Sequence, residues 1–177
     1  IGAILVRSCG CVINGISDHS IDKLVSRTKD RPIASGQISL REAWLFFFLL
    51  ALSSLGLLLF VPKTTIYISM IIAVFILLYP LTKRFLKAPQ FFLGITFGSG
   101  TLISYSLVST NLSLSILLLF IGTVLWIISF DTIYALEDIE DDKLIGINST
   151  PILWGDRAII ISKILHLLFY FSLLLIF

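Results

Sequence analysis

The sequence predicts an all-α fold, a polytopic membrane helix bundle that forms one domain over residues 1–177. The chain is 57% hydrophobic and only 14% charged, whereas a soluble domain carries about a quarter charged residues. Its mean hydropathy is +1.02. Long apolar runs recur along the chain, and its first and last residues both lie inside such runs. We therefore expect a single transmembrane domain that is incomplete at both ends.

Five long apolar runs follow an apolar stretch at the start, and short polar segments separate them. Each has roughly the 17–25 residues that cross the hydrocarbon core of a bilayer. The polar segment before the first run, Ser39-Leu-Arg-Glu42, has the pattern of a helix capping box. Cys9 and Cys11 are two residues apart and fit apolar filling better than a metal site or a disulfide. The runs cover about 42–62, 64–81, 90–109, 112–131 and 158–177.

Two loops between the runs are basic. Segment 23–41 contains Lys23, Arg27, Lys29, Arg31 and Arg41, and segment 82–89 contains Lys83, Arg84 and Lys87. The turn near 63 carries one lysine and the turn near 110 carries no charge. By the positive-inside rule, both basic loops are expected on the cytoplasmic side of the membrane.

Acidic side chains occur in two patterns at the ends of apolar segments. Asn14, Asp18 and Asp22 have helical spacing, i, i+4 and i+8, so they share one helix face. In the second pattern Asp131, Asp138 and Asp142 close another apolar run, with spacings of seven and four. Four crossings separate the two patterns, so an even number of spans returns the chain to the side from which it started. Both acidic clusters are therefore expected at the same membrane surface as the basic loops.

Carboxylates at the membrane are costly unless they have a function. Oxygen ligands without histidine or cysteine partners favour Mg²⁺. In proteins Mg²⁺ is usually bound by a few carboxylates together with phosphate oxygens of a substrate. The two clusters thus predict a diphosphate held between carboxylate faces through Mg²⁺, with Lys83, Arg84, Arg27 and Arg31 neutralising the remaining charge. His166 is expected to be a packing residue, and His19 points away from the acidic face.

Several segments, in order along nearly the whole chain, resemble motifs of the intramembrane UbiA-type prenyltransferases, specifically the 4-hydroxybenzoate polyprenyltransferase branch. The matching residues are Arg7 with Gly10-Cys11, then Asn14, Asp18 and Asp22 of N-D-x-x-D-x-x-x-D, Arg27-Thr-Lys-Asp-Arg31-Pro-Ile-Ala-Ser-Gly36, Tyr79-Pro80-Leu-Thr-Lys83-Arg84 with Pro89-Gln90 and Gly94, and Asp131-Thr-Ile-Tyr134-Ala with Asp138, Asp141, Asp142, Gly146 and Ser149-Thr150.

The resemblance implies a fold and a reaction. The family fold has nine membrane helices, of which about six are expected here. The implied reaction is the Mg²⁺-dependent transfer of a polyprenyl group from polyprenyl diphosphate to 4-hydroxybenzoate in ubiquinone biosynthesis. Arg7 or Arg84 would hold the carboxylate of 4-hydroxybenzoate. The expected location is a bacterial or mitochondrial inner membrane, with the lipid bilayer as surroundings and no nucleic-acid partner.

The residue pattern and the resemblance together predict three groups of site residues. The catalytic group is Asp18, Asp22, Asp138, Asp142, Lys83 and Arg84; the substrate-binding group is Arg7, Asn14, Arg27, Arg31, Asp131 and Tyr134; the metal group is Asn14, Asp18, Asp22, Asp138 and Asp142.

Two positions depart from the family pattern. Gly15 stands where the family has aspartate, and Asn148 stands where many members have lysine. The first departure predicts a weakened metal site, which aspartate at position 15 is expected to restore. Together with the expected truncation at both ends, it leaves a catalytically impaired remnant of the enzyme as the alternative. A membrane transporter is the non-enzyme alternative, because intramembrane carboxylates also mark ion pathways.

Overall fold

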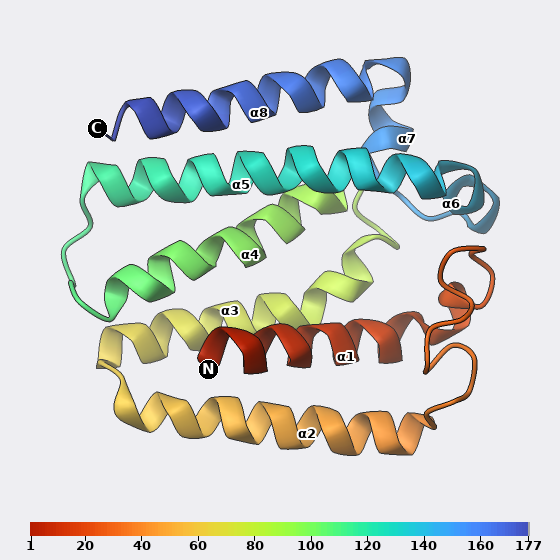
Figure 1. Cartoon of the computed structure of the whole chain (residues 1–177), viewed down its shortest axis with the longest axis horizontal. Coiled ribbons are helices and arrows are strands. Elements are labelled where there is room, and N and C mark those ends of the chain that lie inside the picture. Colours follow the sequence, from red (N-terminus) through yellow and green to blue (C-terminus); the bar gives the residue numbers. More distant parts are fainter. Residues whose placement is uncertain (177) are drawn as a thin grey trace.

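The computed structural model describes residues 1–176, and within that range the chain is helical without strands (Figure 1). Each expected run contains one long helix, which confirms the all-α prediction; Phe177, the last residue of the final run, lies outside the described residues. The long helices are α1 (Gly2–Asp22), α2 (Leu40–Leu57), α3 (Lys63–Thr82), α4 (Pro89–Ser106), α5 (Leu114–Ala135) and α8 (Ala158–Leu174). Shorter elements are η1 (Leu58–Phe60), η2 (Leu136–Asp138), α6 (Ile139–Ile145), α7 (Thr150–Trp154) and η3 (Gly155–Arg157).

Four helical segments are long and apolar enough to cross a membrane. They are Leu40–Phe60, Lys63–Thr82, Leu114–Ile145 and Thr150–Leu174. Helix α4 is 18 residues long but more polar, and it buries Gln90, Thr96 and Ser99. Because α4 packs between α3 and α5, its polar side chains face protein instead of lipid. The chain is therefore an integral membrane protein with one polar helix inside the bundle.

The long helices pack as a curved row in the order α2, α1, α3, α4, α5, α8 (Figure 1). Glycines bring α4 close to α5: a Cβ atom at Gly94 would lie 2.9 Å from Cγ1 of Ile128, and one at Gly98 would lie 2.8 Å from Cγ2 of Val124. Small residues allow such close approach of membrane helices. The close packing fixes α5 relative to the α3–α4 connection, and both contribute to the site.

The connections at one end of the bundle carry the charged groups. The loop 23–39, the α3–α4 connection and the α6–α7 region lie at one end, and the α2–α3 and α4–α5 turns lie at the other (Figure 1). At the charged end Ser39 caps α2, and Ser39 and Glu42 form the expected capping box. The basic loops and the segment with the second acidic cluster thus lie at the same end of the bundle. This agrees with the even number of crossings counted from the sequence.

The second acidic cluster spans a break in the helix. Helix α5 ends at Ala135, a 3₁₀ turn covers Leu136–Asp138, and α6 follows. Asp138 is the N-cap of α6, and three acidic residues occupy its first turn. Negative charge is favourable at a helix N-terminus, so the cluster stabilises a new helix start. Helix α6 ends at Gly146, whose φ of 78° is left-handed, a conformation that glycine adopts readily.

Candidate active site

An open cavity of about 190 Å³ lies at the charged end of the bundle. Helices α1 and α5 contribute opposite walls, and the loop 23–39 and the segment after α6 complete it. Its lining includes every predicted site residue except Arg7 and Arg84, namely Asn14, Asp18, Asp22, Arg27, Arg31, Lys83, Asp131, Tyr134, Asp138 and Asp142. The structure thus brings two distant acidic clusters and the basic loops into one site.

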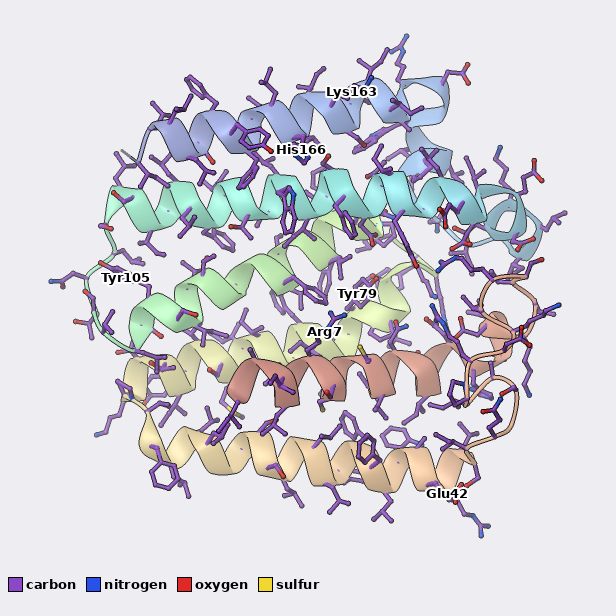
Figure 2. All side chains as sticks on the ribbon, in the orientation of Figure 1. Arg7, Glu42, Tyr79, Tyr105, Lys163 and His166 are labelled. Atoms are coloured by element: carbon purple, nitrogen blue, oxygen red, sulfur yellow. The ribbon has the colours of Figure 1, made fainter. Side chains whose placement is uncertain are left out.

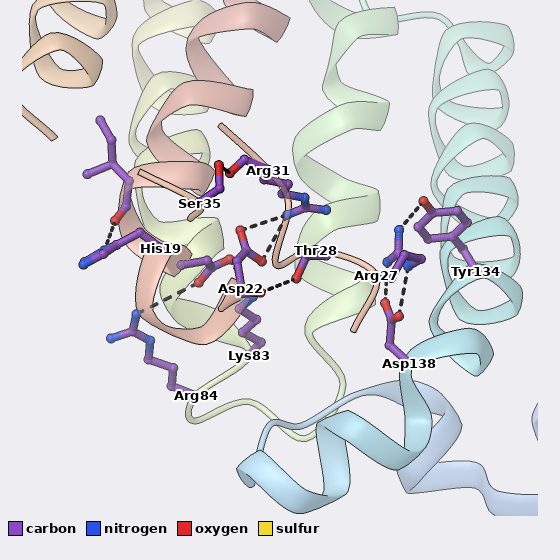
Figure 3. Close-up of polar contacts among 12 residues, drawn as sticks. His19, Asp22, Arg27, Thr28, Arg31, Ser35, Lys83, Arg84, Tyr134 and Asp138 are labelled. Carbon is purple, nitrogen blue, oxygen red and sulfur yellow. Dashed lines mark hydrogen bonds and ion pairs between the residues drawn. The ribbon is translucent and has the colours of Figure 1, made fainter. Parts of the chain in front are cut away.

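The α1 wall carries two buried carboxylates paired with cations (Figure 3). Asp18 is 0% exposed, and Nζ of Lys83 lies 2.5 Å from its Oδ2 atom. Nη1 of Arg31 donates to both carboxylate oxygens of Asp22, at 3.2 and 3.1 Å. Arg84 lies outside the cavity lining, where its Nη2 donates to the carbonyl oxygen of Ser17 at 2.8 Å. One turn of α1 therefore places two carboxylates on the cavity face, as the spacing predicted.

The opposite wall is held by Arg27, which reaches across from the loop 23–39 (Figure 3). Its Nε donates to Oδ1 of Asp138 at 2.9 Å, and its Nη2 donates to the other oxygen of that carboxylate. Its Nη1 donates to the hydroxyl of Tyr134 at 2.5 Å, and its guanidinium lies 4.6 Å from the centre of the Tyr134 ring. The bonds to Asp138 raise the pKa of Arg27 above its usual value, so this side chain stays charged.

A second contact fastens the same loop to the acidic segment. The backbone N–H of Ser26 donates to Oδ2 of Asp141 at 3.0 Å. Together with the Arg27 bonds, this contact closes the loop over the space between α1 and α5. The loop therefore forms one side of the cavity mouth.

The segment after α6 is fixed by three backbone N–H groups. Ile147 donates to the carbonyl of Asp142 at 2.9 Å and Asn148 donates to the carbonyl of Lys83 at 3.0 Å. Thr150 donates to Oε1 of Gln90 at 3.0 Å. The cavity lining also includes Tyr79, Gln90, Asn148 and Ser149, to which sequence reasoning gave no role, although all four lie within or beside the segments that resemble family motifs.

The donor set of the cavity fits a hard divalent cation. Among residues 1–176 no three histidine, cysteine, aspartate or glutamate side chains are grouped closely enough to hold a metal alone. The available donors are carboxylate and amide oxygens on two walls, and Oδ1 of Asp18 is buried without a hydrogen-bond partner. Mg²⁺ typically takes one or two carboxylates and completes its shell with water and phosphate oxygens. The residues therefore fit Mg²⁺ bound together with an anionic substrate.

Position 15 lies beside the loop 23–39. A Cβ atom at Gly15 would lie 3.1 Å from Cδ1 of Ile33, and Gly15 is absent from the cavity lining. A side chain there would first contact Ile33 of the loop 23–39, a loop that also lines the cavity. The expectation that aspartate at this position adds a carboxylate to the metal site stays a prediction.

The histidines lie outside the cavity, as expected. Nδ1 of His19 is 2.9 Å from the carbonyl oxygen of Ile16. His166 lies between α8 and α5 (Figure 2), where its ring packs against Phe169 and Tyr170. Arg7 is an exposed residue of α1 (Figure 2) and makes no ion pair with the described part of the chain.

The fold and the cavity define the class: a polytopic membrane protein with opposed carboxylate walls and basic side chains at one end of its helix bundle. The chain belongs to the UbiA prenyltransferase family, whose profile matches residues 1–177.

Curated relatives include 4-hydroxybenzoate octaprenyltransferases. The protein from Pseudomonas aeruginosa (strain LESB58) is 44% identical over 156 residues, which is 88% of this chain and 53% of the relative. The protein from Legionella pneumophila (strain Corby) is 43% identical over 168 residues, which is 94% of this chain and 60% of the relative. The chain thus spans a little more than half the length of these relatives.

Two solved structures share the fold. The apo structure of a UbiA homolog from Aeropyrum pernix K1 superposes with a TM-score of 0.85 at 29% identity, over 97% of this chain and 66% of that one. A UbiA homolog from Archaeoglobus fulgidus bound to GPP and Mg²⁺ superposes with a TM-score of 0.70 at 19% identity, over 97% of this chain and 70% of that one. The helix arrangement described above is therefore the UbiA fold.

Proposed function

We propose that this chain carries the active site of a Mg²⁺-dependent prenyltransferase that moves a polyprenyl group from polyprenyl diphosphate to 4-hydroxybenzoate, a step of ubiquinone biosynthesis. The observation that carries the proposal is the single cavity in which Asp18 and Asp22 face Asp138 and Asp142. The names of the curated relatives support the choice of acceptor. The proposed location is an inner membrane, bacterial or mitochondrial, with the cavity on the side of the basic loops.

The carboxylates and cations of the cavity are suited to a diphosphate leaving group. Asp18 and Asp22 on one wall, and Asp138 and Asp142 on the other, would hold Mg²⁺, with Asn14 at the edge of the first group. When bound, Mg²⁺ stabilises the negative charge that develops as the bond between the prenyl carbon and the diphosphate oxygen breaks. Lys83 and Arg31 lie on the same wall and add positive charge at fixed positions.

The aromatic and basic side chains are suited to the organic parts of the reaction. Tyr134 lines the cavity, and an aromatic ring face can stabilise an allylic cation; the guanidinium of Arg27 lies over one face of this ring. Asp131 lines the same wall. The ring carbon next to the acceptor hydroxyl then bonds to the prenyl carbon, from which diphosphate departs, and that ring carbon loses its proton to restore the aromatic ring. Arg7 and Arg84 are the two candidates for binding the acceptor carboxylate; Arg84 donates to the carbonyl oxygen of Ser17 and lies 4.0 Å from Asp18.

The proposal can be tested with membranes that contain the complete gene product. Transfer of a labelled prenyl group to 4-hydroxybenzoate is measured with and without Mg²⁺, for the unaltered protein and for Asp138→Asn. The matched control is Asp156→Asn, because Asp156 is exposed and outside the cavity lining. We expect Asp138→Asn to lower the rate by a factor of about 100 or more, as for other groups that stabilise transition-state charge. Transfer that needs no Mg²⁺, or that survives Asp138→Asn, contradicts the proposal.

The geometry favours an active enzyme over a catalytically impaired remnant. The remnant hypothesis rests on Gly15 and on the expected truncation at both ends; a side chain at position 15 would first meet Ile33. All four aspartates proposed to hold the metal line the cavity. The departure at position 15 therefore leaves both carboxylate walls in place.

A further inference from the structure

The hydroxyl group of Ser149 is buried at the cavity wall without a hydrogen-bond partner. Ser149 is 3% exposed, it lines the cavity, and its Oγ makes no hydrogen bond to any described residue. Buried hydroxyl groups are nearly always paired, because an unmade hydrogen bond costs free energy. A free hydroxyl at a cavity wall is therefore positioned for a ligand.

The backbone holds this hydroxyl in place. The residues on either side of Ser149 are fixed by hydrogen bonds, from Asn148 to the carbonyl of Lys83 and from Thr150 to Gln90. Ser149 is the N-cap residue of α7, yet its side chain makes no capping bond. The usual local partner of an N-cap serine is thus not used, so the hydroxyl is left without a bond within the helix.

The surroundings of Ser149 indicate the kind of ligand. The backbone N–H of its neighbour Asn148 donates to the backbone carbonyl of Lys83, and Lys83, Asn148 and Asp142 line the same cavity. A hydroxyl can donate to an anionic oxygen beside a lysine, and bonds to charged groups are the stronger ones. We propose that Ser149 binds the diphosphate group of the prenyl donor by donating a hydrogen bond to a phosphate oxygen. This inference rests on the proposed function.

The test uses the complete gene product, purified, with inorganic pyrophosphate and Mg²⁺ as the probe. The dissociation constant is measured by calorimetry for the unaltered protein, Ser149→Ala and Asp138→Asn. The matched control is Ser162→Ala, because the Ser162 hydroxyl is also buried and unpaired among the described residues but lies on α8 away from the cavity lining. Melting temperatures without ligand show whether each variant folds.

We expect Ser149→Ala to weaken binding of Mg²⁺-pyrophosphate about tenfold and Ser162→Ala to leave it unchanged. The melting temperature of ligand-free Ser149→Ala should not fall, because the variant loses an unpaired group and no contact; a merely structural serine would lower it. Unchanged binding in Ser149→Ala, with binding lost in Asp138→Asn, overturns the inference and leaves the proposed function standing. If the unaltered protein does not bind the probe, or Asp138→Asn binds it normally, the proposed function fails and the inference falls with it.

Discussion

Nζ of Lys83 lies 2.5 Å from Oδ2 of Asp18, and this pair joins residues 65 positions apart. Asp18 is fully buried, whereas the lysine side chain is partly exposed at the cavity. The next nearest cation is Arg84, 4.0 Å from the other carboxylate oxygen. Lys83 therefore supplies most of the charge compensation for Asp18 and fastens the end of α3 to α1.

Replacing Lys83 should lower the stability of the protein, because the buried carboxylate of Asp18 loses its paired cation. Lys83→Met leaves a buried carboxylate without its close partner, and we expect the free energy of unfolding to fall by about 3 kcal/mol. Lys163→Met is the control, because Lys163 is exposed and forms no ion pair in the part of the chain that is described. Thermal unfolding in detergent measures both. The double variant Lys83→Met with Asp18→Asn should regain much of the loss, and a further additive loss would contradict the pairing.

Arg27 should control how firmly the loop 23–39 is closed. Arg27→Gln removes the bonds to Asp138 and Tyr134, so we expect faster amide hydrogen exchange in this loop. Arg41→Gln is a suitable comparison, because Arg41 is exposed and makes no ion pair with residues 1–176. Exchange measured by mass spectrometry on the Mg²⁺-free protein tests the prediction. Equal exchange in the two variants would show that the Arg27 contacts do not hold the loop.

The fold was largely predictable because membrane helices leave a strong signal in apolar run length. The break in the helix at Leu136–Asp138 was not predictable, because this stretch contains neither proline nor glycine. Helical spacing identified Asp18 and Asp22 as one face. It could not identify which cation pairs with which carboxylate, because Arg27 and Asp138 are 111 residues apart and meet only through packing of the whole bundle.

Uncharged site residues were the other part that the sequence did not assign. Gln90 and Ser149 have no distinctive spacing, and neither carries a charge that must be explained in a membrane. Their roles follow from their burial and from their hydrogen bonding: Gln90 accepts a bond from a backbone N–H, and the Ser149 hydroxyl has no partner among the described residues. Only a three-dimensional structure gives this information. Their places within segments that resemble family motifs were the available signal.

Gln90 should be needed for the position of the segment after α6. It is buried, and its Oε1 accepts a hydrogen bond from the backbone of Thr150. Gln90→Ala leaves that buried N–H unpaired, so we expect the free energy of unfolding to fall by about 1–3 kcal/mol. Gln37→Ala alters an exposed glutamine and should have little effect. Chemical or thermal unfolding of the two variants compares them, and equal stability would argue that Gln90 does not fix this segment.

The two ends of the bundle should lie on opposite sides of the membrane. Ser35 lies in the basic loop 23–39 and Asn111 in the α4–α5 turn at the other end. In a protein whose Cys9 and Cys11 are replaced by alanine, Ser35→Cys should resist an impermeant thiol reagent added outside intact bacterial cells. Asn111→Cys should react, because the positive-inside rule places the basic loops in the cytoplasm. Reaction of both positions from outside would refute this topology.

Gly15→Asp should leave the dependence of transfer on Mg²⁺ concentration unchanged. The new Cβ atom would start 3.1 Å from Cδ1 of Ile33, on the side of α1 that contacts the loop 23–39, so we expect the added carboxylate not to reach the metal. Because the Ile33 contact is the flexible end of a side chain, a small shift accommodates the new Cβ atom. The initial rate of the complete gene product is titrated against Mg²⁺, with Asp18→Asn as the variant expected to abolish transfer. A lower Mg²⁺ requirement in Gly15→Asp would mean that position 15 reaches the metal after all, and that glycine there weakens the site.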